Sequence, residues 1–163
     1  MKRTMEKGDV FKQIMGHYPT GVTIITTIDE NGEPAGLTVN SFTSVSIDPL
    51  LVLWCIDKKT SSFETFLKAD GFTVHTLASD QVEACWAFAR KGSDRFKGVN
   101  WYTSENKLPI IKDSLGTLEC RTVQRIDAGD HIILVGEVLD LFKNDKEPLL
   151  FYNRKAGTIP KDW

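Results

Sequence analysis

The chain has 163 residues, 41% hydrophobic and 26% charged, proportions that are ordinary for a globular protein with a core of its own. Its formal net charge of -2 argues against a nucleic-acid partner, which would need a basic surface. The longest apolar run, residues 50–56, is too short to cross a bilayer, and the charged N-terminus lacks a secretory signal, so we expect one cytoplasmic domain over residues 1–163 with no membrane partner.

The first third of the chain predicts a helix followed by strands. Asp9 is placed to cap a helix at the N-terminus. The apolar side of this helix consists of Val10, Phe11, Ile14 and Met15. The β-branched segment 20–28 predicts a strand that turns at residues 31–32, and residues 35–47 are expected to continue as one extended segment. The apolar run at 50–56 predicts a central strand that is buried on both faces.

Two further helices are expected, each opened by a capping box. Ser61 with Glu64 would cap the first helix, and Asp80 with Glu83 would cap the second. The strand between these helices would carry His75 on its half-exposed face. The apolar side of the second helix is expected to consist of Val82, Cys85, Trp86 and Ala89.

The last third reads mainly as strands. Residues 116–145 predict two or three strands around a turn at residues 128–130. Many short strands with small helices between them favour an all-β antiparallel barrel or sandwich over a parallel sheet. The three cysteines are odd in number and far apart, which favours reduced thiols over a disulfide framework.

The sequence contains no common catalytic or nucleotide-binding motif. G-x-G-x-x-G, G-x-x-x-x-G-K-[ST], G-x-S-x-G, H-E-x-x-H and C-x-x-C are all absent from it. The three histidines are too scattered to suggest a metal cluster. Any chemistry is therefore expected to come from a bound cofactor.

Three segments nevertheless have the composition of a binding site. Residues 37–47 carry hydroxyl and amide groups that a planar heterocycle would pair, although an exposed edge strand would explain them equally well. Lys58 and Lys59 precede hydroxyl groups at the start of a helix, which suits either a phosphate or an ordinary capped surface helix. His131 follows a glycine turn, at the mouth of a barrel or in a turn without a special role.

In order along the chain, PTGVTIITT, GEPAGLTVNSFTSVSIDPLLVLWCI, FTVHTL, AGDHIILVGEV and PLLFY resemble motifs of the flavin reductase family of FMN-binding split-barrel proteins. The similarity extends from about Pro19 to Tyr152. Its most specific part is the combination of GLTVNSF with a downstream GDH. The resemblance implies an all-β fold with short helices, in which an antiparallel Greek-key split β-barrel forms a homodimer with flavin near the subunit interface.

The resemblance also implies an NAD(P)H-dependent flavin reductase. Such an enzyme binds FMN or FAD, reduces it by hydride transfer from NADH or NADPH, and supplies reduced flavin to a partner monooxygenase. Three alternatives stay open: a flavin-binding electron-transfer protein that retains its FMN, an oxidase of the pyridoxamine-phosphate type, and a barrel without a cofactor. The downstream GDH favours the reductase, because an electron carrier needs no contact with nicotinamide.

Matching the family's motifs to this sequence implies a set of site residues. The flavin ring would lie along Thr38, Val39, Asn40 and Ser41. The ribityl and phosphate side would be faced by Ser44 and Ser46, and the flavin edge by Cys55, Asp57, Lys58 and Lys59. The phosphate would be bound by Thr60, Ser61, Ser62, Arg90 and Lys91. Tyr152 corresponds to an aromatic residue near the pocket, and His131 corresponds to the catalytic-site histidine on the nicotinamide side.

Overall fold

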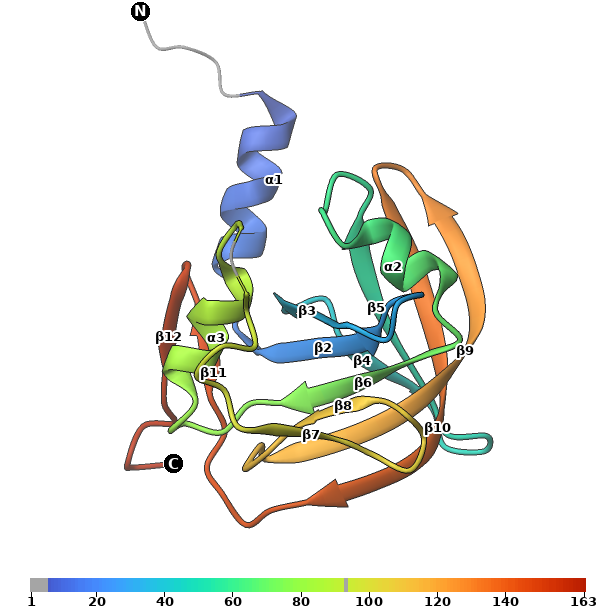
Figure 1. Cartoon of the computed structure of the whole chain (residues 1–163). Coiled ribbons are helices and arrows are strands. Elements are labelled where there is room, and N and C mark those ends of the chain that lie inside the picture. The colour runs from blue at the N-terminus through green and yellow to red at the C-terminus, as the bar shows by residue number, and fades with distance from the viewer. Residues whose placement is uncertain (1–5, 93) are drawn as a thin grey trace, which may run out of the picture.

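The computed structural model describes residues 6–92 and 94–163, and Figure 1 shows that strands dominate this fold. The helices are α1 (Lys7–Gly16), α2 (Phe63–Lys68) and α3 (Val82–Ala89). The strands are β1 (Thr20–Gly21), β2 (Thr23–Ile28), β3 (Pro34–Val39), β4 (Thr43–Ser46), β5 (Leu51–Asp57), β6 (Gly71–Thr76), β7 (Trp101–Thr103), β8 (Pro109–Ile111), β9 (Gly116–Ala128), β10 (His131–Lys143), β11 (Leu150–Tyr152) and β12 (Lys155–Gly157). None of the described helices is long and apolar enough to cross a membrane.

Both tight turns that the sequence predicts are present. β2 and β3 form a hairpin with Gly32 at φ 78°, and β9 and β10 form a longer hairpin with Gly129 at φ 69°. Glycine enters this left-handed region without steric strain. The prediction of one extended segment over residues 35–47 is wrong, because β3 pairs with β2 whereas β4 pairs with β5.

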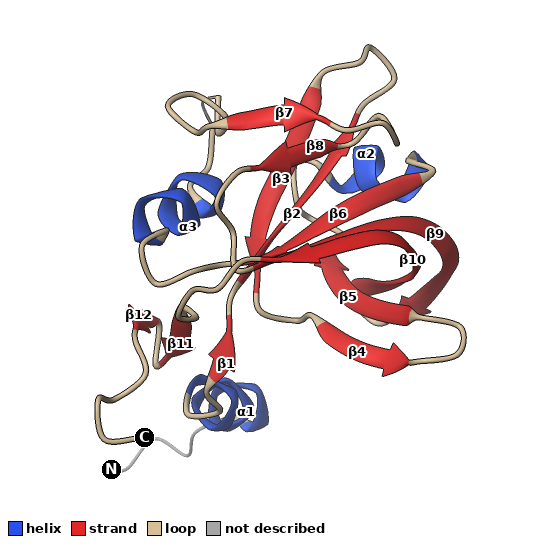
Figure 2. Ribbon diagram, turned by 90° about the horizontal axis from the view of Figure 1, so that it is seen from below, coloured by secondary structure: helices blue, strands red, loops and turns tan. Residues whose placement is uncertain are grey.

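Seven strands form one antiparallel sheet in the order β3-β2-β6-β9-β10-β5-β4. β3 and β4 are its two edges, yet only residues 40–42 separate them in the chain. Four steps along an extended chain reach at most about 14 Å, so the sheet curls until its edges approach each other. These two described edges do not pair, and the barrel is split along this line. A smaller sheet of β1, β11 and β12 lies next to α1 (Figure 2).

The core has two parts, one inside the barrel and one under α3. Trp54 meets Phe66 and Phe72 edge to face inside the barrel, with ring centroids 5.1 and 5.8 Å apart. Under α3, Phe88 packs on β3 at Gly36, where an added Cβ would lie 2.7 Å from the Phe88 ring. Only glycine therefore allows α3 to approach β3 this closely.

α1 differs from the sequence prediction in its start and in its surroundings. It begins at Lys7 with Glu6 as the N-cap, so Asp9 lies in the first turn of the helix. All of its residues are described and none is buried, and Phe11 and Ile14 are 65% and 62% exposed. The apolar spacing correctly predicts a helix with one apolar side, but nothing in the described chain covers that side.

Both predicted capping boxes are wrong. The N-caps are Ser62 for α2 and Gln81 for α3, each one residue later than the predicted Ser61 and Asp80. Neither cap forms a side-chain hydrogen bond with its helix in the described chain. Asp80 instead forms an ion pair with Lys146 over 3.1 Å. Its carboxylate, which the local pattern predicted to cap α3, therefore binds a residue far away in the sequence.

Two predictions of buried faces are corrected by the sheet order and by the packing of α3. β5 lies second from the sheet edge, and only one of its faces is buried. The buried face carries Val52, Trp54 and Ile56, and the half-buried face carries Leu51, Leu53 and Cys55. α3 turns Cys85 and Phe88 inward, whereas Val82 and Trp86 are exposed. All three cysteines are described and are free thiols.

His75 is fully buried, so the prediction of a half-exposed position is wrong. Nδ1 lies 2.9 Å from the carbonyl oxygen of Ile24, and Nε2 accepts the N–H of Ile111 over 3.0 Å. Ile111 belongs to β8. This strand therefore covers the face of β6 that the alternating sequence pattern predicted to be half exposed. Burial lowers the pKa of His75 to about 4, so this histidine is neutral at physiological pH.

Candidate functional site

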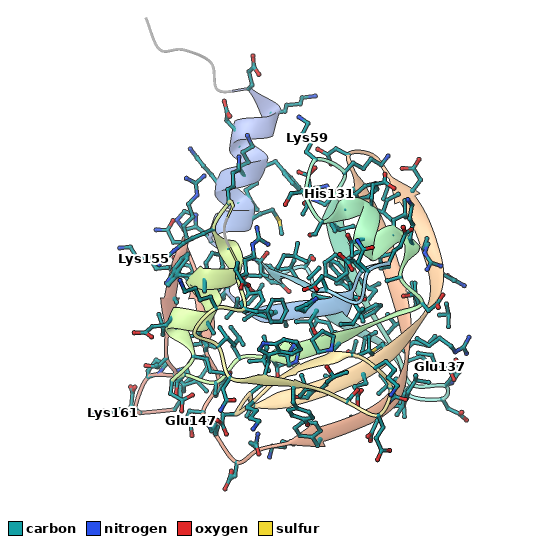
Figure 3. All side chains as sticks on the ribbon, viewed as in Figure 1. Lys59, His131, Glu137, Glu147, Lys155 and Lys161 are labelled. Atoms are coloured by element: carbon teal, nitrogen blue, oxygen red, sulfur yellow. The ribbon has the colours of Figure 1, made fainter. Side chains whose placement is uncertain are left out.

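The end of β5 and the start of β10 lie side by side. Asp57 pairs with His131 in the antiparallel register, and the N–H of Lys58 donates to the carbonyl of Asp130 over 3.0 Å. Figure 3 shows Lys59 and His131 at the same corner of the molecule. The fold thus brings together two segments that the sequence analysis assigned to one site and that are more than 70 residues apart in the chain.

The charged groups at this corner are already paired in part. The Nζ atom of Lys58 lies 2.6 Å from Oδ1 of Asp127 and 2.7 Å from the carbonyl oxygen of Gly129. Nδ1 of His131 lies 2.7 Å from Oδ1 of Asp130, and this hydrogen bond, with the charge of His131, lowers the pKa of Asp130. Oδ1 of the neighbouring Asp57 accepts the N–H of Lys59 over 2.8 Å and so shapes the turn after β5.

The segment between the two sheet edges is fixed to β5 by a hydroxyl group. Oγ of Ser41 accepts the N–H of Cys55 over 2.9 Å and donates to the carbonyl of Cys55 over 3.0 Å. Oγ1 of Thr38 donates to the carbonyl of Cys85 over 2.6 Å. These hydroxyls therefore have partners within the chain, whereas Asn40 is exposed beside the split and Val39 packs partly against the core.

A cavity of about 310 Å³ opens beside the start of α2. Its lining includes Gly36, Ser61, Ser62 and Arg95. Oγ of Ser62 is buried and has no hydrogen-bond partner among the described residues. Nη1 of Arg95 donates to the carbonyl of Gly36 over 2.8 Å, and burial lowers the pKa of this guanidinium. The guanidinium of Arg95 and the two serine hydroxyls, of which that of Ser62 has no partner in the described chain, provide donors for an anion such as phosphate. The carboxylate of Asp94 also lines the cavity, and its Oδ1 accepts the N–H of Phe96 over 3.0 Å.

The structure does not bring all the predicted site residues to this cavity. Arg90 is exposed and lines a separate surface groove with Trp86, and Lys91 is exposed next to it. Ser44 and Ser46 lie on β4 at the sheet edge. The ring of Tyr152 contacts His17 at the end of α1, with centroids 5.9 Å apart.

Arg95 is the cation of this cavity, and the sequence analysis did not assign it to the site. Its Nε donates to the carbonyl of Arg90 over 3.1 Å, so the loop folds back and places the second arginine where the first was expected. The sequence offered one weak signal, a charged loop directly after a helix, but it could not show which arginine turns inward.

The comparison with protein families gives the assignment. The family described as "Flavin reductase like domain" matches residues 15–160, which is most of the chain. The chain belongs to the flavin reductase family. This result confirms the resemblance found in the sequence and the expectation of an oxidoreductase that acts on flavin.

Individual relatives agree with this membership over almost their whole length. The chain is 41% identical over 156 residues to "FMN reductase (NADH) SmoA" of Agrobacterium fabrum, covering 96% of this chain and 88% of the relative. It is 36% identical over 160 residues to "Flavin-dependent monooxygenase, reductase subunit HsaB" of Rhodococcus jostii, covering 94% and 82%. The NADH:FAD oxidoreductase SgcE6 of Streptomyces globisporus, solved with NAD and FAD fragments, superposes with a TM-score of 0.90 at 32% identity, covering 98% of each chain.

Proposed function

We propose that this flavin reductase uses NADH to reduce FMN or FAD and supplies the reduced flavin to a flavin-dependent monooxygenase. Relatives named as an NADH-dependent FMN reductase and as the reductase subunit of a monooxygenase support the donor, the acceptor and the partner. The observation that carries the proposal is the cavity at the start of α2, where Arg95 and the unpaired Oγ of Ser62 fit a flavin phosphate.

We expect the flavin to extend from the cavity to the ends of the strands. The phosphate would be bound by the cavity residues Ser61, Ser62 and Arg95, with Lys59 and Thr60 directly before them in the chain. The ring would lie beside the split of the barrel, along residues 38–41 and Cys55, where Ser41 holds the linker against β5. Free cysteines suit a reducing compartment, so we also place the protein in the cytoplasm.

Bound flavin supplies the hydride acceptor, and the residues of the chain orient the two reactants. Asp130 engages Nδ1 of His131, so the other ring nitrogen, Nε2, is the one that this arrangement presents to a ligand. His131 is therefore placed to position the nicotinamide. Correct orientation of two bound reactants can lower the activation barrier by several kcal/mol.

Replacing His131 by alanine is expected to lower NADH turnover about tenfold or more, because the nicotinamide loses a positioning contact. FMN affinity is expected to stay within about twofold, since the phosphate cavity is formed by other residues. Steady-state NADH oxidation and a fluorescence titration of FMN measure the two effects. Unchanged turnover would remove His131 from the site.

We further propose a homodimer, because α1 needs a cover that residues 6–92 and 94–163 do not provide. An isolated helix of 10 residues is only marginally stable in water, yet α1 has no buried residue. Light scattering is expected to give twice the chain mass of 18.3 kDa, and Ile14→Glu is expected to shift the protein toward monomer. A monomer for the wild type at all concentrations would contradict this proposal.

A titration of turnover with flavin separates this function from its main alternative. NADH oxidation that rises and saturates with added FMN is expected for an enzyme whose reduced flavin diffuses away. Oxidation that needs no added flavin, in a protein purified with yellow colour, would indicate a prosthetic flavin and a dedicated acceptor. Tightly bound FMN without NADH oxidation would support the electron-transfer protein instead.

A further inference from the structure

Lys58 contacts the end of β9 and the β9–β10 turn, together residues 127–130, at three points. Its Nζ atom binds the carboxylate of Asp127 over 2.6 Å and the carbonyl of Gly129 over 2.7 Å. Its backbone N–H binds the carbonyl of Asp130 over 3.0 Å. The three acceptors belong to Asp127, Gly129 and Asp130, and the last of these residues directly precedes His131. These contacts hold the lysine against the turn.

The same loop continues into the cavity at the start of α2. The N–H groups of Lys59 and Thr60 both bind Asp57, the first to its carboxylate over 2.8 Å and the second to its carbonyl over 3.0 Å. The N–H of Phe63 then binds the carbonyl of Thr60 over 3.0 Å. Hydrogen bonds thus fix Lys58 to the β9–β10 turn, and further hydrogen bonds fix the backbone on either side of Lys58 from Asp57 to the first turn of α2.

We propose that Lys58 is a positioning residue that couples the flavin loop to the turn that carries His131. Binding of the flavin phosphate by the 57–62 loop would order the β9–β10 turn through Lys58 and so set His131 for the nicotinamide. This proposal rests on the proposed function, because it assigns the two coupled segments to the two reactants of that reaction. It also gives the adjacent lysines different roles, with Lys58 holding the turn and Lys59 left at the corner near His131.

Removing either side of this contact is expected to affect the nicotinamide more than the flavin. Lys58→Met and Asp127→Asn should each raise the KM for NADH about fivefold, with kcat and the FMN dissociation constant changed less than about twofold. The double variant should be no worse than Lys58→Met alone, because both changes remove one interaction. Lys58→Arg should restore the wild-type KM, since a guanidinium can bind both acceptors.

The matched control is Lys68→Met on α2. The side chain of Lys68 lies 3.9 Å from Glu30 in an exposed pair, and its loss should leave the KM for NADH unchanged. The contacts of this part of α2 with Arg125 of β9 are made by the carbonyls of Leu67 and Ala69, which the variant retains. A merely structural role of Lys58 would instead lower kcat, raise the KM for NADH and weaken flavin binding together, and Lys58→Arg would not separate these constants.

Hydrogen exchange tests the coupling without relying on turnover. Peptides that span residues 125–132 should exchange faster in Lys58→Met than in the wild type, whereas peptides from β6 should be unaffected. Added FMN should slow exchange of residues 125–132 in the wild type and should not do so in Lys58→Met. Equal exchange of this segment in both proteins, with and without FMN, would overturn the proposal.

The two measurements also separate this proposal from the proposed function. Absence of both NADH oxidation and FMN binding would refute the reductase, and the flavin-free exchange comparison would still decide whether Lys58 holds the turn. A KM for NADH that is unchanged in both variants, in an active reductase, would refute the positioning role alone.

Discussion

Replacing Arg95 by methionine is expected to raise the dissociation constant of FMN about 30-fold, since a charge-assisted hydrogen bond to phosphate contributes about 2 kcal/mol. Arg95 is the cation that lines the cavity of Ser61 and Ser62, and its guanidinium is held there by the carbonyl of Gly36. A fluorescence titration measures the change, and riboflavin, which lacks the phosphate, is the control ligand. Riboflavin affinity is expected to stay within about twofold, because the variant retains the ring-binding surface.

The rival assignment from the sequence is tested by Arg90→Met. Arg90 lines a different groove, so its loss should change FMN affinity much less than the loss of Arg95. An equal loss of affinity for FMN and riboflavin in Arg95→Met would show that the arginine supports the fold rather than the phosphate. An unaltered FMN titration in this variant would show that the phosphate binds elsewhere.

Acidification is expected to destabilise the fold through His75. The pKa of this buried imidazole is about 4, below the ordinary value of about 6.5, so the unfolded chain binds a proton that the folded chain excludes. The contribution to stability is therefore complete above about pH 6.5 and is lost as the pH falls toward 4. Between about pH 7.5 and about pH 5 the free energy of unfolding should fall by about 2 kcal/mol from this group.

Urea unfolding of the wild type and of His75→Gln at the two pH values isolates this contribution. Glutamine keeps a donor and an acceptor but does not titrate, so the variant should lose about 2 kcal/mol less on acidification, whatever its stability at neutral pH. If the variant does not fold, an NMR titration of His75 in the wild type gives its pKa directly. Equal acid sensitivity in both proteins, or a pKa near 6.5, would refute the assignment.

The parts of the fold that follow from local chemistry could be predicted from the sequence. Gly32 and Gly129 mark the two hairpins because both take a positive φ, and the β-branched segment before Gly32 forms β2. The order of motifs gave the family, and with it the reductase activity. The capping box at Asp80 failed because its carboxylate pairs with Lys146, 66 residues away, which no local pattern can show.

The structure brings two of the predicted site segments together, but the contacts that each side chain makes could not be predicted from the sequence. The loop after β5 and the histidine after Gly129 do meet at one corner, as the motifs imply. The loop after α3 decides whether Arg90 or Arg95 faces the cavity. The sequence of this loop has no helical or strand periodicity from which its conformation could be predicted. The two adjacent lysines have the same sequence context, and the contacts of Lys58 with Asp127, Gly129 and Asp130 distinguish it from Lys59.

The most direct test of this account is an anaerobic assay in which catalytic amounts of the protein are mixed with NADH and an excess of free FMN. We predict that the visible absorbance of oxidised FMN disappears over many turnovers, and that NADH is consumed in equal amount. Loss of absorbance limited to one equivalent per chain would point to a retained flavin. FMN that stays oxidised, although the folded protein and NADH are both present, would contradict the central claim.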